Sequence, residues 1–166
     1  MESNPVIVES VGEGAYQARV HAQGPSFMVD EPVDLGGTGS GPTPYDLLSG
    51  ALGACTNITV RLYAQRKRWP LTHVQVSVAH RRDPATGRDI FERTLYIEGD
   101  LDEKQRARLL EIAEHCPVER TLHDGSNITT RMVTEVRKVH PGKPCDETHP
   151  KAVDEACREV DPTATA

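Results

Sequence analysis

The chain has 166 residues, an apolar share of 37% and a formal net charge of −6, which suit a single folded domain. Only 4% of the residues are aromatic and the net charge is negative, so the composition gives no support for nucleic-acid binding. No apolar run is long enough to span a membrane, and the first residues carry no signal region. We therefore expect no membrane association, a cytoplasmic location and cysteines that are mostly reduced.

Three short alternating runs near the N-terminus, 6–8, 16–21 and 27–29, are separated by glycine and proline. This pattern predicts a meander of antiparallel strands. A glycine-rich stretch, 36–42, comes next. Because no Gly-Lys-Ser/Thr motif follows it, we expect a flexible loop and not a phosphate-binding loop.

A long helix is predicted from about residue 44 to residue 68. Thr43 is its expected N-cap, Pro44 suits the first helical position, and Asp46 completes a capping box. Apolar residues recur at three- and four-residue steps and predict a buried stripe of Leu48, Leu52, Cys55, Ile58 and Leu62. Small residues between them let another backbone come close, so a sheet or a partner subunit has to cover this helix.

Two strands, 73–78 and 91–98, are predicted on either side of a turn and form an antiparallel hairpin. A second helix is expected to begin after Asp102, with Gln105 completing its capping box, and to end near His115. Its inward side chains are expected to be Leu109, Leu110 and Ala113.

Pro117 permits a short third helix over 118–122, and a final strand is predicted at about 127–138. We expect residues 1–140 to form the domain and residues 141–166, rich in proline and charge, to form a loosely ordered polar tail. Metal-binding residue types occur from residue 140 onward, but their spacing matches no zinc pattern, so we expect no metal at His140, Cys145, His149 and Cys157.

Two cysteines are distinguished by their positions. Cys55 lies about twelve residues into the long helix, roughly 18 Å from its start at ~1.5 Å per residue, beyond the reach of the helix dipole. Cys116 precedes the short helix, where free backbone N–H groups favour a thiolate, and His115 adjoins it. Local physics therefore favours Cys116 as the nucleophile and Cys55 as a core residue.

Short motifs surround both cysteines and extend over roughly residues 15–135. They are Asp30-Glu31-Pro32, Gly36-Gly37, Gly41-Pro42-Thr43-Pro44-Tyr45, Ala51-Leu52-Gly53-Ala54-Cys55-Thr56 and Cys116-Pro117-Val118. Together they resemble the OsmC/Ohr family of thiol peroxidases, and its OsmC-like branch most of all. The resemblance implies an α+β fold, an intertwined homodimer with antiparallel sheets wrapped around long central helices, and active sites at the subunit interface.

The family pattern implies the reverse roles for the two cysteines. The cysteine of the central helix, here Cys55, is the peroxidatic one in that family, and the Cys-Pro cysteine, here Cys116, is the resolving one. The family also supplies a glutamate that orients an arginine beside the thiolate. Where the peroxidase branch has Pro-Glu, this chain has Pro44-Tyr45, so Asp46 is the candidate acid, although its capping box explains it without catalysis.

The arginine that would hold the Cys55 thiolate is not assigned by the motifs. Arg19 falls in the N-terminal region from which the family draws this residue, although the local motif differs. Other arginines remain candidates, namely Arg81, Arg82, Arg93, Arg120 and Arg131.

Two functions from different classes follow. The first is a thiol-dependent peroxidase that reduces organic hydroperoxides or hydrogen peroxide through Cys55 and Cys116, with a thiol as reductant and without metal or prosthetic group. The second is a homodimeric module that binds a small ligand or senses redox state, which the Tyr45 replacement favours. Purely structural cysteines are the third interpretation.

Overall fold

The computed structural model describes residues 5–12, 14–22, 24–136, 138 and 148–163. These residues belong to two compact units. The first consists of Met1–Leu47 and Ile128–Glu147, and the second of Leu48–Asn127 and Thr148–Ala166. The predicted boundary between residues 140 and 141 lies outside the described residues and stays a prediction.

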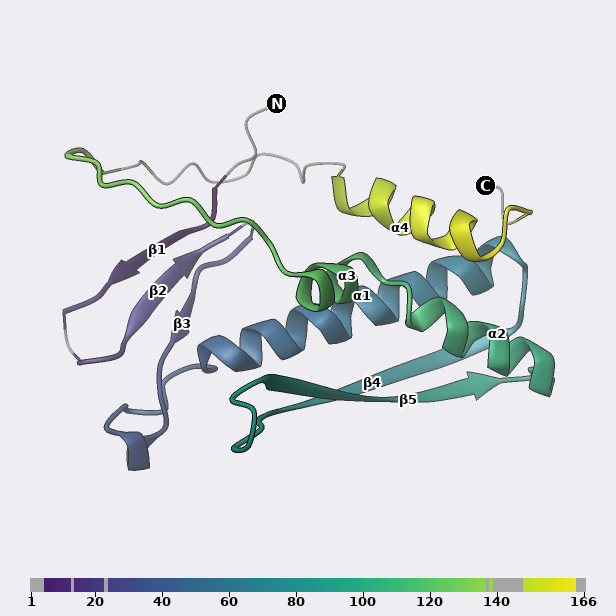
Figure 1. The fold of residues 1–166 in the computed structure, drawn as a ribbon, viewed down its shortest axis with the longest axis horizontal. Helices are drawn as coiled ribbons and strands as arrows, with labels where there is room; N and C mark the ends of the chain where they lie inside the picture. Colours follow the sequence, from purple (N-terminus) through teal and green to yellow (C-terminus); the bar gives the residue numbers. More distant parts are fainter. Residues whose placement is uncertain (1–4, 13, 23, 137, 139–147, 164–166) are drawn as a thin grey trace. The chain divides into compact units, whose positions relative to one another are not determined.

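The first unit contains a small antiparallel sheet, shown in purple in Figure 1. Its strands are β1 (Ile7–Ser10), β2 (Ala18–His21) and β3 (Phe27–Val29), in the order β1-β2-β3. Val20 is opposite Val8 on one side and Phe27 on the other. The predicted meander is therefore confirmed.

The glycine-rich stretch is fixed to the strand that precedes it, so the expectation of a flexible loop was wrong. The buried Asp30 carboxylate accepts hydrogen bonds from the hydroxyl of Thr38 at 2.6 Å and the hydroxyl of Ser40 at 3.0 Å. Their backbone N–H groups bind the same oxygen. At Gly37, a Cβ atom would lie 1.9 Å from the carbonyl oxygen of Glu31. The Asp-Glu-Pro and Gly-Gly motifs thus build one loop, whose short helical turn is η1 (Val33–Leu35).

The predicted strand near residues 127–138 is absent from the part of that range that the structure describes. Residues 127–136 have no strand partner among the described residues. Their apolar side chains are strongly exposed: Ile128 is 88% and Met132 98% accessible. An alternating pattern predicts a strand only where another strand is available for pairing.

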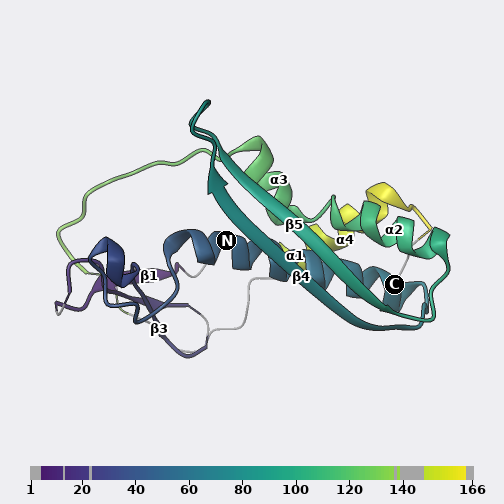
Figure 2. The same cartoon turned by 90° about the horizontal axis from the view of Figure 1, so that it is seen from below.

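The second unit is built on the long helix α1 (Pro44–Arg66), from Leu48 onward, and on the hairpin of β4 (Leu71–Arg82) and β5 (Asp89–Gly99). The predicted N-terminal box is confirmed, because Thr43 and Asp46 exchange side-chain to backbone hydrogen bonds. Helix α1 lies along one face of the hairpin (Figures 1 and 2), where the Asn57 amide donates to the Val74 carbonyl at 2.8 Å.

The buried stripe of α1 is shifted from the predicted one. Leu52 and Cys55 are buried, as expected, but Leu48 and Ile58 are 41% and 45% exposed. The hidden face continues instead through Thr56, Thr59, Val60, Tyr63 and Ala64. Threonine is tolerated there because each hydroxyl donates to the carbonyl four residues earlier, at 2.8 Å.

Three shorter helices complete this unit: α2 (Glu103–Ala113), α3 (Pro117–Asp124) and α4 (Thr148–Val160). The Asp102–Gln105 capping box and the short helix after Cys116 are confirmed. On α2, Leu109 and Ala113 are buried as predicted, but Leu110 is exposed and Ile112 takes its place in the core.

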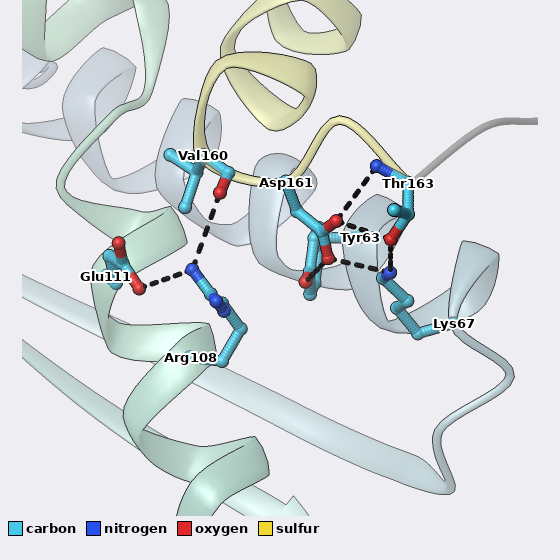
Figure 3. Close-up of polar contacts among 7 residues, drawn as sticks. All are labelled: Tyr63, Lys67, Arg108, Glu111, Val160, Asp161 and Thr163. Atoms are coloured by element: carbon cyan, nitrogen blue, oxygen red, sulfur yellow. Dashed lines mark hydrogen bonds and ion pairs between the residues drawn. The ribbon is translucent and has the colours of Figure 1, made fainter.

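Helix α4 corrects the expectation of a loosely ordered tail for the described residues 148–163. Its buried residues Val153, Ala156 and Cys157 follow helical spacing, and Val153 and Cys157 join the core of α1 and α2. Figure 3 shows the end of the helix, where the Tyr63 hydroxyl donates to the Asp161 carboxylate at 2.7 Å. The mixture of charge and apolar residues reflects an amphipathic helix. None of the helices in the described ranges has the length and apolar character needed to cross a membrane.

Candidate active site

Cys55 and Cys116 are packed together inside the second unit. Cys55 projects from the middle of α1 and is 2% exposed, and Cys116, just before α3, is fully buried. The two cysteines belong to the same buried cluster. Apolar side chains enclose them, from Leu52, Val78, Phe91, Val118 and Leu122. Neither sulfur is in a disulfide.

Cys116 is the more acidic thiol of the pair. Its interaction with the Cys55 thiol is the main cause that lowers its pKa, to about 6, against the opposing effect of burial. The Thr56 hydroxyl, 3.6 Å from the sulfur, and the backbone N–H of Glu119 also favour the thiolate. Cys116 is the N-cap of α3, so the predicted position at the positive end of a helix is confirmed. These contacts favour the thiolate form at Cys116.

Cys55 has the opposite tendency. Its interaction with the Cys116 thiol and its burial raise the pKa of the Cys55 thiol well above the ordinary value. The backbone N–H of Val118 favours the Cys55 thiolate but does not reverse this. A second polar group lies against the sulfur: the imidazole Nε2 of His149, on α4, is 3.3 Å from Cys55 Sγ.

Arg93, one of the six candidates from the sequence, lies close to the two cysteines, beside Thr56. Its Nη1 donates to the Thr56 hydroxyl at 2.9 Å, and its Nη2 forms an ion pair with Glu119 at 2.8 Å. The positive charge of Arg93 therefore lies behind Thr56 and helps to lower the pKa of Cys116. Sequence alternation contained a signal for it, because Arg93 shares the inward face of β5 with Phe91 and Leu95.

A pocket of about 390 Å³ adjoins the cluster that contains the two cysteines. Its apolar wall includes Leu52, which belongs to that cluster, and Phe91 and Leu122, which pack against it. Charged and polar groups form the rest of the lining, namely Arg88, Asp89, Arg93, Glu119 and His123. The site thus combines an apolar wall with an ion pair close to a thiolate.

The metal-type residues of the C-terminal segment are separated by the fold. His140 and Cys145 lie outside the described residues. His149 contacts Cys55, whereas Cys157 belongs to the core cluster between α1 and α2. Among the residues that the structure describes, no group of three or more His, Cys, Asp or Glu side chains is arranged to hold a metal ion.

The family model of OsmC-like proteins matches residues 37–131, which is more than half of the chain and includes both cysteines. The chain belongs to the OsmC-like protein family. The matched region of this OsmC-like chain ends before α4, so the helix that carries His149 lies outside it. No curated protein is significantly similar to the chain.

Solved structures share the OsmC-like fold at low sequence identity. An OsmC-like protein from Mycoplasma pneumoniae has a TM-score of 0.59 and 19% identity, covering 74% of this chain and 89% of that one. The organic hydroperoxide resistance protein OhrB of Bacillus subtilis has a TM-score of 0.51 and 21% identity, covering 71% and 90%. An organic hydroperoxide resistance protein from Elizabethkingia anophelis has a TM-score of 0.54 and 19% identity, covering 72% and 89%. The α+β fold is therefore that of the OsmC-like proteins.

Two further candidates of this OsmC-like chain, Arg19 and Asp46, belong to the first unit. Arg19 is exposed on β2. Asp46 accepts hydrogen bonds from the backbone N–H of Thr43 at 2.9 Å and from its hydroxyl at 2.8 Å. The capping role of Asp46 is thus confirmed, and a catalytic role for either residue stays a prediction.

Proposed function

We propose that the protein is a thiol-dependent peroxidase in which Cys55 and Cys116 form the redox pair. The observation that carries this proposal is that two buried cysteines share one cluster, with the thiolate favoured at Cys116, beside a pocket with an apolar wall. Membership of the OsmC-like family and the fold shared with hydroperoxide resistance proteins support it.

The environments of the two sulfurs suit a sequence of two displacements. The Cys55 thiolate attacks the terminal oxygen of ROOH, the O–O bond breaks, and Cys55 becomes a sulfenic acid while RO⁻ takes up a proton to leave as ROH. The Cys116 thiolate then attacks the sulfur of that sulfenic acid, forms the Cys55–Cys116 disulfide and releases hydroxide. Two equivalents of an external thiol reduce the disulfide. The contacts that favour the thiolate at Cys116 favour this second step.

The pocket favours an organic hydroperoxide as the substrate. Leu52, Phe91 and Leu122 offer apolar surface to an alkyl or aryl group, while Arg93 is a hydrogen-bond donor for the peroxide end. Hydrogen peroxide would gain nothing from the apolar wall. A bulky organic hydroperoxide should therefore react faster than hydrogen peroxide.

Turnover with three serine or alanine variants tests the proposal. With cumene hydroperoxide and dithiothreitol, Cys55→Ser should abolish consumption of the peroxide, and Cys116→Ser should slow recycling and leave Cys55 as a trapped sulfenic acid. Cys157→Ala is the matched control, because this third buried cysteine lies in a separate core cluster, and it should keep wild-type turnover. Undiminished turnover of Cys55→Ser would remove this residue from the mechanism.

We also propose that the protein acts as a homodimer. Apolar side chains are exposed on the described residues of each unit: Ile128, Met132 and Val136 in the first, and Leu48 and Ile58 along α1 in the second. A second copy of the chain would bury these groups. Sedimentation equilibrium should give twice the mass of one chain, and a monomer at micromolar concentration would contradict the proposal.

The catalytic cycle also suggests where the protein works. Both cysteines have to return to the thiol state after every turnover, which a thiol reductant of the cytosol can do. We therefore retain the cytoplasm as the proposed location.

A small-ligand or redox-sensing module is the second candidate function. The observation that favours it is the near-complete burial of both sulfurs, which slows access by a substrate. Slow formation of the disulfide, without catalytic turnover, would favour this function over the peroxidase.

A further inference from the structure

The geometry points to His149 as the base that takes the proton of Cys55, an inference that rests on the proposed function of this cysteine pair. His149 lies on α4, outside the region matched by the family model. Its Nε2 atom is 3.3 Å from Cys55 Sγ, within hydrogen-bond distance for sulfur. It touches the reacting atom directly, so the proposed role is catalytic.

Cys55 needs such a base because its surroundings favour the thiol. The sulfur lies far from the start of α1, where the dipole of that helix gives no help. The Arg93 guanidinium donates a hydrogen bond to Thr56 and pairs with Glu119, and its charge favours the thiolate of Cys116. The surroundings favour a negative charge on Cys116, so a charge on Cys55 is stabilised only by a cation close by. An imidazolium on His149 would provide it.

The proton follows a closed path in the proposed reaction. Neutral His149 accepts the Cys55 proton on Nε2, which gives an imidazolium next to the thiolate. The thiolate attacks ROOH, and the imidazolium returns the same proton to RO⁻, which leaves as ROH. Cys55 ends as a sulfenic acid and His149 ends neutral, ready for the next cycle.

The fold holds α4 firmly enough to position this histidine. Val153 and Cys157 are packed in the core with α1 and α2. Polar contacts add to this along the helix: Asp154 pairs with Arg66 of α1, and Glu159 accepts from Arg120 of α3. These buried and charged contacts hold α4, the helix that carries His149, against the rest of the second unit. His149 is half-buried, which allows proton exchange with the solvent.

The test measures the alkylation rate of Cys55 and does not depend on peroxidase activity. In a Cys116→Ser background, iodoacetamide labelling of Cys55 at neutral pH is followed by peptide mass spectrometry. His149→Phe keeps a planar ring without a proton acceptor, and His149→Asn keeps a polar side chain without a base of comparable strength. Both should lower the rate about tenfold or more, because only a few per cent of an unassisted thiol is ionised at pH 7. Glu155→Gln, an exposed position on the same helix, should match the parent.

The same variants with cumene hydroperoxide separate the two proposals. If His149 is the base, sulfenic acid formation at Cys55 should fall about a hundredfold in His149→Phe and His149→Asn. Addition of free imidazole should recover part of the rate in His149→Ala. Unchanged alkylation in both variants, or faster alkylation in His149→Ala without any need for imidazole, would overturn the inference and show a ring that only covers the sulfur. If alkylation depends on His149 but the parent does not consume hydroperoxide, the peroxidase proposal fails and the role of His149 as a base stands.

Discussion

Arg93 reaches Cys116 through Thr56: its Nη1 donates to the Thr56 hydroxyl at 2.9 Å, and that hydroxyl lies 3.6 Å from Cys116 Sγ. The strand β5 and the helix α1 therefore meet at the thiolate. A guanidinium that binds the hydroxyl oxygen leaves the hydroxyl hydrogen free for the sulfur or for the Leu52 carbonyl. The positive charge of Arg93 and the hydroxyl of Thr56 both favour ionisation of the Cys116 thiol.

This relationship predicts the effect of removing the hydroxyl. Thr56→Val keeps the shape of the side chain but deletes one group that favours the thiolate, so the pKa of Cys116 should rise from about 6. Thiolate absorbance in the ultraviolet, measured across pH and assigned by comparison with Cys116→Ser, follows this ionisation. Thr72→Val on the exposed face of β4 should leave the titration unchanged. A Thr56→Val titration that matches the wild type would show that the hydroxyl does not act on Cys116.

The lowered pKa of Asp30 leads us to expect that the stability of the fold decreases in acid. Hydrogen bonds, the Thr38 hydroxyl first among them, lower the pKa of the Asp30 carboxyl in the folded state. A lowered pKa contributes stability in full above the unfolded value of about 3.9, and this stability is lost as pH falls below it. Asp30→Asn should therefore lower the thermal midpoint at neutral pH and show a smaller further decrease on acidification below about pH 4. Scanning calorimetry measures both.

Asp34→Asn is the matched control for Asp30→Asn, because this exposed carboxyl lies four residues further along the same loop. It should retain the wild-type midpoint and the wild-type dependence on acid. Equal thermal midpoints for Asp30→Asn and the wild type at neutral pH would contradict the structural role of the Asp30 loop.

We expect the Tyr63 hydroxyl to stabilise the C-terminal end of α4 (Figure 3). It donates to Asp161 at 2.7 Å, and Lys67 pairs with the same carboxylate at 2.6 Å. Tyr63→Phe removes one hydrogen bond to a charged acceptor and should lower the free energy of unfolding by about 1.5–3 kcal/mol. Amide hydrogen exchange in α4 should become faster, while Tyr96→Phe, an exposed tyrosine on β5, should have no effect. Equal exchange in Tyr63→Phe and the wild type would show that this bond does not hold the helix.

Local sequence chemistry predicted much of the fold. The capping boxes at Thr43 and Asp102 and the N-cap position of Cys116 were correct because each depends on residues within a few positions of one another. The predictions that were wrong concern positions whose burial is decided by tertiary contacts. Ile58 was expected inside and is exposed, because which face of α1 is covered depends on the hairpin and on α2 and α4.

The site was predicted in part. The motifs pointed to both cysteines, which the structure places in one buried cluster, and the N-cap position expected for Cys116 is confirmed. Arg93 remained one of several candidates, because the sequence does not show which face of β5 packs against α1. His149 was missed because it lies 94 residues from Cys55 and is brought there by α4. The C-terminal segment is rich in charged residues, so its sequence was not interpreted as the amphipathic helix α4, in which Val153 is buried.

Peptide mapping of the oxidised protein tests the central claim most directly. Reduced protein is treated with one equivalent of cumene hydroperoxide, quenched with acid after increasing times, and analysed by mass spectrometry without reduction. The account predicts rapid, stoichiometric formation of a Cys55–Cys116 disulfide, with Cys157 still a free thiol. Consumption of the hydroperoxide without this disulfide, or oxidation of Cys157 before the pair, would contradict it.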